Sequence, residues 1–386
     1  MYLYNMLSYW EKTSLLNYDI IIVGGGIVGL STACALLENN TQLKVAVLDR
    51  SIIPTGASSR NAGFACVGSV QELEDDLVNS PASEVAALVE QRYKGLLALR
   101  KRLGDDAIGY LPCKGFELLF EGEEHFINKI DELNKLLEPV FGQLIYREKK
   151  ALIPSFGFSD RCKNLIENSA EGQIHTGKMM SSLLQYSRQL GVAVFGGCLV
   201  DRWEEEETGV TVIAIDGVLK EEIPFRAKQI VVCTNAFSKN LLPDLDLNPG
   251  RGQVLITKPI PNLQFEGVFH YDAGYYYFRN LGDRIILGGG RNLDFEAEQT
   301  CEFGLTDVVM NKLLSELSEL IIPNTPFEIE HQWAGIMGFG AKNKQPVCRF
   351  HSDRVLLGLR LGGMGVAIGS QLGNDLATMV VENPNG

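Results

Sequence analysis

A strand, a glycine-rich turn, a helix and a second strand are expected in succession near the start of the chain. Residues 19–23 are Asp-Ile-Ile-Ile-Val, an apolar run typical of a strand buried on both faces of a parallel sheet. A Gly-x-Gly-x-x-Gly sequence follows at residues 24–29, residues 30–37 indicate a helix, and residues 44–48 form another apolar run. This order predicts a βαβ unit of about 30 residues. It therefore favours an α/β fold built on a parallel sheet.

The three glycines of this turn suit the binding of a dinucleotide. Gly24 permits the tight turn, Gly26 lets a pyrophosphate approach the backbone, and Gly29 lets the helix pack closely on the strand. Ile27 and Val28 lie where the helix N-terminus offers N–H groups and the positive end of its dipole to phosphates. The alternative is a structural glycine turn in an α/β domain that binds no nucleotide.

An acidic residue ends the second predicted strand. Asp49 stands about 20 residues after the last glycine, where a carboxylate accepts hydrogen bonds from a ribose 2′-hydroxyl and repels a 2′-phosphate. Arg50 follows it and is predicted to contact the same ligand. The turn and the carboxylate together predict a dinucleotide site at the end of these strands.

A second cluster of small residues occupies positions 56–63. Its glycines and hydroxyls suit a backbone pressed against a flat or phosphorylated ligand, and its arginine would offset the ligand's negative charge. An ordinary surface loop is the alternative. The residues predicted here to contact the ligand are Ala57, Ser58, Ser59, Arg60, Asn61 and Gly63.

A third glycine-rich cluster, at residues 358–369, precedes the last predicted helix and offers a second helix N-terminus. Two such turns at opposite ends of one chain suit one extended cofactor held at both ends. FAD has this shape, because its adenine and pyrophosphate lie at one end and its isoalloxazine ring at the other. The residues predicted here to contact FAD are Arg360, Gly362, Gly363, Met364, Gly365 and Val366.

Composition excludes several other classes of protein. The 386 residues suggest two or three folding units, because single cores stop growing near roughly 250–300 residues. A formal net charge of −13 argues against nucleic-acid binding. No apolar run reaches the roughly 20 residues of a membrane span, and we expect a cytoplasmic protein. The eight cysteines are scattered, which argues against a disulfide framework, and no metal site is predicted.

The chain resembles the D-amino-acid-oxidase-type flavoproteins, the superfamily of glycine oxidase, sarcosine oxidase and the D-amino acid dehydrogenases. The segments that carry this resemblance are, in order, 19–29, 47–63, 231–236, 251–253, 275–279, 288–291, 333–335 and 362–369. It implies a Rossmann-like FAD-binding domain with an inserted antiparallel-sheet substrate domain. The implied FAD-binding segments are 18–83, 145–240 and 333–386, and the implied substrate segments are 84–144 and 241–332. The resemblance adds four predicted FAD contacts, at Val200, Asn235, Ala236 and Gly335.

The resemblance also implies an FAD-dependent oxidoreductase. Such enzymes move a hydride from the carbon beside an amine to flavin N5, after which the imine hydrolyses. We therefore expect a small amino acid, imino acid or related amine as substrate, and oxygen or another electron acceptor as partner. The alternatives are a 2-hydroxy acid dehydrogenase and an FAD-binding protein without turnover. His270 is a candidate base in the pocket, against the alternative of a surface or core histidine.

The sequence departs from the pattern of these relatives at three places. In glycine oxidase the Trp-Ala-Gly stretch continues to an arginine that pairs with the substrate carboxylate, and Met337 stands there in this chain. Sarcosine oxidases attach flavin to a cysteine in that stretch and carry an oxygen-activating lysine on a sheet strand. Here no cysteine lies between Cys301 and Cys348, and Ile286 takes the lysine position. We therefore expect noncovalent FAD.

Other residues are available to orient the substrate. Arg291, Arg279 and Arg360 each end or interrupt an apolar strand, and a guanidinium group suits a carboxylate. Tyr275 and Tyr277 would share one face of a strand, and Tyr275 matches the substrate-site tyrosine of glycine oxidase. The catalytic site is predicted at Tyr275, Arg291 and Arg360, with sheet packing as the alternative for the tyrosines and a structural role for each arginine.

Overall fold

The computed structural model describes residues 7–218, 220–341 and 344–383. A six-stranded sheet with the order β18-β19-β12-β1-β2-β8 forms one half of the molecule. All its neighbouring strands are parallel except β18, which pairs antiparallel with β19. The strands are β1 (Ile20–Val23), β2 (Val45–Leu48), β8 (Ala193–Phe195), β12 (Gln229–Val232), β18 (Val347–Ser352) and β19 (Val355–Leu359).

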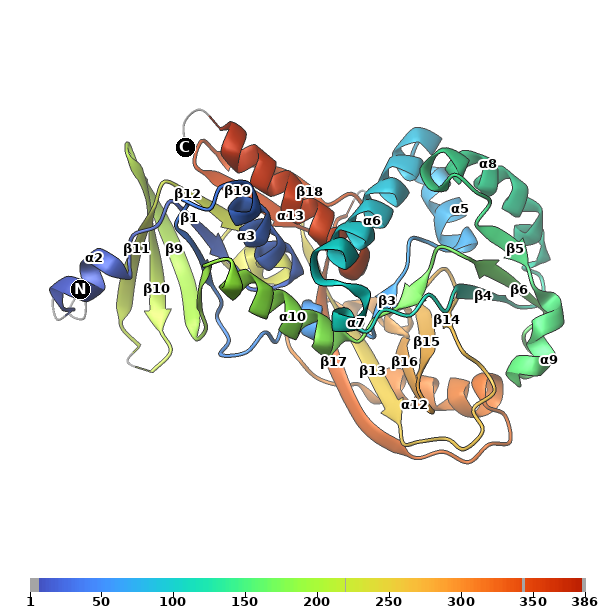
Figure 1. Cartoon of the computed structure of the whole chain (residues 1–386). Coiled ribbons are helices and arrows are strands. Elements are labelled where there is room, and N and C mark those ends of the chain that lie inside the picture. The colour runs from blue at the N-terminus through green and yellow to red at the C-terminus, as the bar shows by residue number, and fades with distance from the viewer. Residues whose placement is uncertain (1–6, 219, 342–343, 384–386) are drawn as a thin grey trace.

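This parallel sheet is covered on both faces, so its central strands β1, β2 and β12 are buried throughout, and all their residues except Gln229 are apolar. Helices α3 (Ile27–Asn39), α10 (Thr176–Gln189) and α13 (Gly365–Glu382) pack together over one face, as Figure 1 shows. The other face packs against a three-stranded antiparallel sheet. Its strands are β9 (Cys198–Glu206), β10 (Gly209–Asp216) and β11 (Glu222–Ala227).

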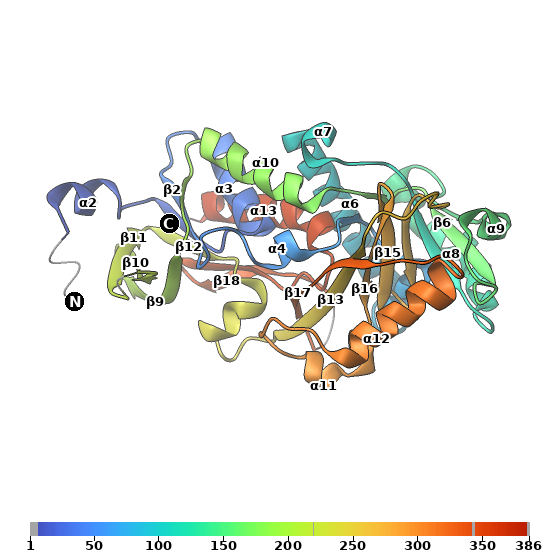
Figure 2. The same cartoon turned by 90° about the horizontal axis from the view of Figure 1, so that it is seen from below.

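An eight-stranded sheet with the order β17-β13-β16-β15-β14-β4-β6-β5 forms the second half. Its pairs are antiparallel except β14 with β4. Helix α12 (Asp307–Glu316), which continues into the π-helical turn Leu317–Ile321, packs against the apolar face of this sheet (Figure 2). The strands are β4 (Gly115–Leu119), β5 (Tyr146–Glu148), β6 (Asn164–Asn168), β13 (Asn248–Thr257), β14 (Val268–Tyr271), β15 (Tyr276–Leu281), β16 (Arg284–Gly289) and β17 (Ile329–Phe339).

The long helix α6 (Ala82–Leu103) connects the two halves. Its Gly95 lies against α13, where a Cβ atom would come within 2.2 Å of the carbonyl oxygen of Ala367. The short strands β3 (Phe64–Ala65) and β7 (Gly172–Gln173) pair with each other. The remaining α-helices are α2 (Tyr9–Ser14), α4 (Ala57–Arg60), α5 (Val70–Asn79), α7 (Asp105–Ile108), α8 (Ile130–Phe141), α9 (Ile153–Phe156) and α11 (Phe295–Glu298).

The structure confirms the predicted fold class, a parallel α/β unit combined with an antiparallel sheet. The division of the chain into domains stays a prediction, and two elements depart from its boundaries. β5 and β6 belong to the eight-stranded sheet, although residues 145–240 were expected in the cofactor-binding domain. α6 begins the expected substrate segment but packs on α13. Across the three described ranges, no helix combines the length and the apolar character needed to cross a bilayer.

Candidate active site

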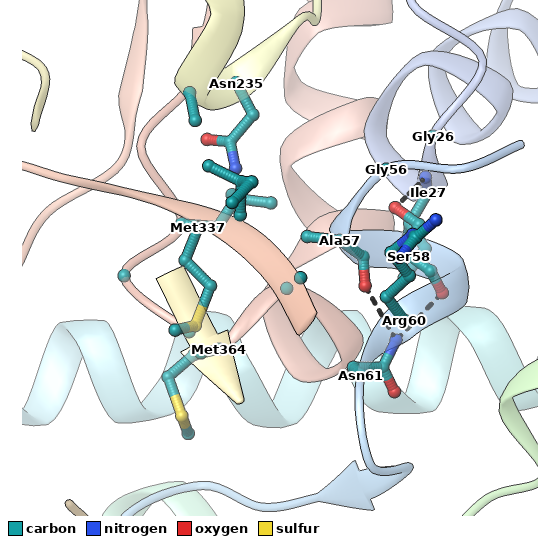
Figure 3. Close-up of a pocket in the computed structure, with 18 of the residues that line it drawn as sticks. Gly26, Ile27, Gly56, Ala57, Ser58, Arg60, Asn61, Asn235, Met337 and Met364 are labelled. Atoms are coloured by element: carbon teal, nitrogen blue, oxygen red, sulfur yellow. Dashed lines mark hydrogen bonds between the residues drawn. The ribbon is translucent and has the colours of Figure 1, made fainter. Parts of the chain in front are cut away.

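One continuous cavity of about 450 Å³ is lined by residues from both glycine-rich turns. Gly24–Val28, between β1 and α3, and Gly362–Val366, between β19 and α13, both contribute to its wall. Figure 3 shows Met337 and Met364 on one side of this space, with Ile27 and Ser58 on the other. The two distant turns thus open into the same space, as binding of one long ligand requires.

The first turn is shaped by the close packing of its glycines. Gly24 has a φ of +109°, a conformation that residues with side chains rarely adopt. A Cβ atom on Gly29 would lie 2.0 Å from the carbonyl oxygen of Gly24, so helix α3 can approach β1 only with glycine there. Gly29 does not line the cavity itself. The N–H of Ile27 donates to Oγ of Ser58 at 3.0 Å, which places a hydroxyl at the N-terminus of α3.

Asp49 follows β2 and lies beside the first turn. Its Oδ2 accepts the N–H of Gly25 at 2.7 Å, and its Oδ1 accepts the N–H of Ser51 at 2.9 Å. Asp49, Arg50 and Val200 all line the cavity. The carboxylate is therefore held in one orientation by the backbone while its outer edge still faces the cavity.

A stacked pair next to Asp49 was not foreseen from the sequence. The guanidinium carbon of Arg50 lies 3.6 Å from the ring centre of Phe237, and burial lowers the pKa of this arginine. Phe237 also lines the cavity. It stands directly after the predicted contacts Asn235 and Ala236, both of which are in the lining. The pair gives this end of the cavity a flat wall with one cation.

The second cluster forms the short helix α4 and the turn around it. Ala57, Ser58 and Asn61 line the cavity, and the amide of Asn61 donates to the carbonyl oxygens of Ala57 and Ser58 (Figure 3). Ser59 does not line it, because its hydroxyl donates to the carbonyl oxygen of Pro54. Gly63 does not line it either.

Arg60 lines the cavity, and two of its donors are occupied by backbone. Its Nε donates to the carbonyl oxygen of Thr55 and its Nη1 to that of Ala334, both at 2.9 Å. The Nε1–H of Trp333 donates a hydrogen bond to the carbonyl oxygen of Arg60 at 2.8 Å. Arg60 thus fastens α4 to β17, which brings the predicted contact Gly335 into the lining beside it.

The predicted role of Arg360 as a substrate clamp is corrected by the structure. Its Nη1 donates to Oδ2 of Asp246 at 2.8 Å, its Nε donates to the carbonyl oxygen of Gln345, and it does not line the cavity. Its backbone N–H donates to Oδ1 of Asn235 at 3.0 Å, with a φ of +65°. The carboxylate of Asp246 thus already neutralises the charge of Arg360, and the hydrogen bonds of this residue hold the turn before α13 in place.

The alternative clamp Arg279 is corrected in the same way. It is fully buried within the eight-stranded sheet and does not line the cavity. Its guanidinium donates to the carbonyl oxygens of Ala62 and Ile174 and to Oε1 of Gln173. Burial lowers its pKa to about 10. Arg279 ties β15 to the turns around β3 and β7.

Arg291 is the remaining candidate, and it lines the cavity. Its guanidinium carbon lies 4.0 Å from the ring centre of Phe339, 5.1 Å from that of Phe295 and 5.7 Å from that of Tyr275. Burial lowers its pKa, which the nearby Tyr275 and Tyr277 oppose. Within the described parts of the chain, no carboxylate forms an ion pair with it. Arg291 is thus a half-buried cation that faces the cavity and is surrounded by aromatic rings.

The two tyrosines of the predicted strand face point as expected. Tyr275 and Tyr277 line the cavity, whereas Tyr276 and Phe278 pack in the core on the other side of the sheet. Burial raises the pKa of Tyr277 to about 12, so it remains a neutral phenol. Ile286, where the sarcosine oxidases carry lysine, is buried and apolar.

His270, the candidate base from the sequence, lines the cavity, but sequence reasoning missed several polar residues near it. Cys66 and Glu171 lie together with His270, and Lys344 lines the cavity while pairing with Asp76 at 2.6 Å. They come from segments that meet only through long-range pairing, such as β3 with β7. No local pattern in the sequence connects them.

A comparison with models of protein families identifies the family of this chain. Residues 19–379 match the model of the DAO family, described as FAD dependent oxidoreductase. The chain belongs to this family. This family is one of FAD-dependent oxidoreductases, and membership agrees with the predicted enzyme class and with FAD as cofactor.

Individual members of the family are distant from this chain. The bifunctional protein ThiO/ThiG of Synechocystis sp. is 25% identical over 340 residues, which make up 85% of this chain and 46% of that protein. The chain thus spans less than half the length of that relative. Human mitochondrial L-2-hydroxyglutarate dehydrogenase is 25% identical over 358 residues, 84% of this chain and 72% of that protein. The crystal structure of glycine oxidase from Geobacillus kaustophilus superposes with a TM-score of 0.76, at 19% identity and 95% coverage of both chains.

The donors in the cavity of this DAO-family chain fit FAD. At the N-termini of α3 and α13, no helix N–H donates to the side chain of the N-cap residue, Gly26 or Met364. The N–H of Ile27 donates to Ser58 instead, and the other backbone N–H groups of the two first turns would be available to a ligand. The first turn and Asp49 would hold the ADP half, and Ser58, Asn61 and the turn before α13 would lie along the flavin.

Proposed function

We propose that the chain oxidises the C–N bond of a small amino acid, imino acid or related amine. Bound FAD supplies a two-electron acceptor for such a reaction. The substrate carbon would lose a hydride, and the resulting imine would hydrolyse in water. An amine that arrives neutral needs no strong base.

The environment of Arg291 is the observation that carries the choice of an acid, a substrate with a carboxylate group. A desolvated guanidinium without a carboxylate partner costs free energy that a bound carboxylate recovers. A planar guanidinium also pairs with a carboxylate through two parallel hydrogen bonds. Arg291 would therefore fix the acid group of the substrate. Tyr275 and Tyr277, next to it in the wall, would exclude water from the reacting carbon.

A 2-hydroxy acid is the second candidate substrate. The same arginine would bind its carboxylate, and human L-2-hydroxyglutarate dehydrogenase matches most of this chain. The two candidates differ in the bond that is oxidised, C–N or C–O. A non-catalytic role, the remaining alternative from the sequence, is disfavoured by membership of an oxidoreductase family.

Anaerobic titration of the FAD-loaded protein separates these candidates. The visible absorption of the flavin is followed as D-amino acids, N-methyl amino acids, polyamines or 2-hydroxy acids are added. Bleaching by amino acids and not by hydroxy acids supports the proposal, whereas bleaching by hydroxy acids alone contradicts it. The rate at which air then restores the colour tells an oxidase from a dehydrogenase.

A further inference from the structure

Three side chains of types that bind metal ions converge in the wall of the cavity. Sγ of Cys66, one carboxylate oxygen of Glu171 and Nε2 of His270 all lie within 4.8 Å of one another. Nε2 of His270 is 3.3 Å from the sulfur and 3.3 Å from Oε2 of Glu171. All three residues line the cavity. The sequence alone predicts no metal site, because these positions are far apart along the chain.

The three residues are held by three different parts of the fold. Cys66 directly follows β3, Glu171 directly precedes β7, and His270 lies in β14. Since β3 pairs with β7, the sulfur and the carboxylate are brought together by the backbone. The ring of His270 packs edge-on against Phe64, with 5.3 Å between ring centres. The cluster is therefore fixed by strands and not by mobile surface loops.

The carboxylate of Glu171 has a defined orientation. Its Oε1 accepts the N–H groups of Val67 at 3.0 Å and Gly68 at 3.2 Å, which leaves Oε2 for the cluster. Gly115 makes room for it, because a Cβ atom there would lie 1.9 Å from Oε2. Backbone groups that hold a ligating carboxylate in place are typical of metal sites.

The ligand chemistry of the three side chains is compatible with one ion. Metal ions bind cysteine as the thiolate and histidine as the neutral imidazole, so a bound cation takes the place of the protons that these groups carry without it.

We propose that Cys66, Glu171 and His270 bind a divalent cation of the zinc type. A sulfur, an imidazole nitrogen and a carboxylate oxygen are a ligand set that suits Zn²⁺ and not Mg²⁺ or Ca²⁺. Three protein ligands and a free fourth position are the arrangement of zinc sites that act on substrates. Here the fourth position faces the cavity, where a water molecule or an oxygen of the substrate would occupy it.

The test is a titration of the FAD-loaded, chelator-treated protein with Cd²⁺, which resembles Zn²⁺ and gives an ultraviolet charge-transfer band with thiolates. We expect saturation at one equivalent per chain and displacement by Zn²⁺. Cys66→Ser is expected to abolish the band. His270→Gln and Glu171→Gln are expected to weaken binding by at least about tenfold.

The matched control is Cys301→Ser, because Cys301 is exposed and lies outside the cluster. This variant should bind Cd²⁺ as the parent does. FAD content and circular dichroism show whether each variant is folded. If His270→Gln and Glu171→Gln do not fold, the conservative variant Cys66→Ser alone tests the proposal. A missing band in the parent, a band that survives Cys66→Ser, or one lost in Cys301→Ser would overturn the proposal. In those cases the cluster is a proton-linked His–Glu pair.

Discussion

At the scale of single residues, the charge of Arg291 is the feature on which the proposed chemistry depends. Replacing it with methionine removes the partner of the substrate carboxylate but keeps an apolar side chain among the rings of Phe295 and Phe339. Hydrogen bonds between charged groups contribute about 1.5–3 kcal/mol, so KM should rise about ten- to a hundredfold. Steady-state kinetics with the substrate found by titration measure this.

The kinetics of three variants separate charge from geometry. Arg291→Lys keeps the charge but lacks the planar guanidinium group. Its KM should therefore lie between those of the parent and Arg291→Met. Arg349→Met, at an exposed arginine of β18, is the control and should leave KM unchanged. If Arg291→Met lowered kcat and left KM unchanged, the result would contradict a role of Arg291 in binding the carboxylate.

Glu117 couples the stability of the protein to pH. Burial raises its pKa from 4.5 to about 7, although the N–H groups of Val70 and Gln71 stabilise its charged form. Between these values the folded chain keeps a proton that the unfolded chain has lost. The free energy of unfolding therefore falls as pH rises through this window, by about 1.4 kcal/mol per unit.

Glu117→Gln removes this dependence. Relative to the parent, the variant should gain about 3 kcal/mol of unfolding free energy between pH 4.5 and 7.5. Urea denaturation at several pH values measures it, with Glu121→Gln, at an exposed carboxylate, as the control. Parallel pH profiles for the parent and Glu117→Gln would show that the carboxyl group is not protonated in the folded state.

The three candidate arginines show what sequence reasoning can reach at this scale. Arg279, Arg291 and Arg360 occupy similar positions at the ends of apolar strands, and all three were plausible clamps. They differ in whether the fold supplies an acceptor: Gln173 and main-chain carbonyls for Arg279, Asp246 for Arg360, and aromatic rings for Arg291. Those acceptors are distant in sequence, so only the structure separates the three.

At the scale of elements, the contact between β1 and α3 depends on Gly29. Gly29→Ala would force apart two backbones, because the added Cβ has 2.0 Å to the carbonyl oxygen of Gly24. We expect a loss of about 1–3 kcal/mol of stability and of FAD affinity with it. Gly177→Ala is the matched control, since Gly177 lies in α10 outside the cavity and an added Cβ there would come no closer than 3.4 Å to a neighbouring atom.

Both variants are compared by urea denaturation and by FAD titration. Gly177→Ala should stay within about 0.5 kcal/mol of the parent. If the two variants were equally stable, the glycine at position 29 would not be required for packing.

Elements with a strong local pattern could be predicted, and those stabilised by distant partners could not. The apolar runs at β1 and β2 lie where the sequence places them. β18 was not predicted, because its residues are mostly polar or exposed and its pairing with β19 supplies the order. The same reason hid Cys66 and Glu171. His270 was a candidate for the pocket, but no spacing along the chain connects it with the other two residues.

At the scale of the whole molecule, the cavity joins segments from both ends of the chain, so cofactor binding should stabilise all of it. FAD at about 100 times its Kd adds about 2.7 kcal/mol to the free energy of unfolding. The melting temperature should therefore rise by several degrees, as differential scanning fluorimetry measures. FMN and AMP, which reach one end each, should produce smaller shifts at the same concentration. Equal shifts for FMN and FAD would show that the ADP half is not held.

The strand order of the parallel sheet has a consequence for biosynthesis. β1 lies between β2 and β12, and β12 lies next to β19. β2 follows β1 closely along the chain, whereas β19 leaves the ribosome roughly 330 residues after β1. At translation rates of about 5–20 residues per second, the nascent chain waits for roughly 15–65 s before the last parallel partner emerges. Throughout that interval an apolar strand at the edge of the incomplete sheet lacks its neighbouring strand. Slow synthesis or a crowded polysome would therefore favour aggregation of this chain, and chaperones that shield nascent β-edges should increase its yield.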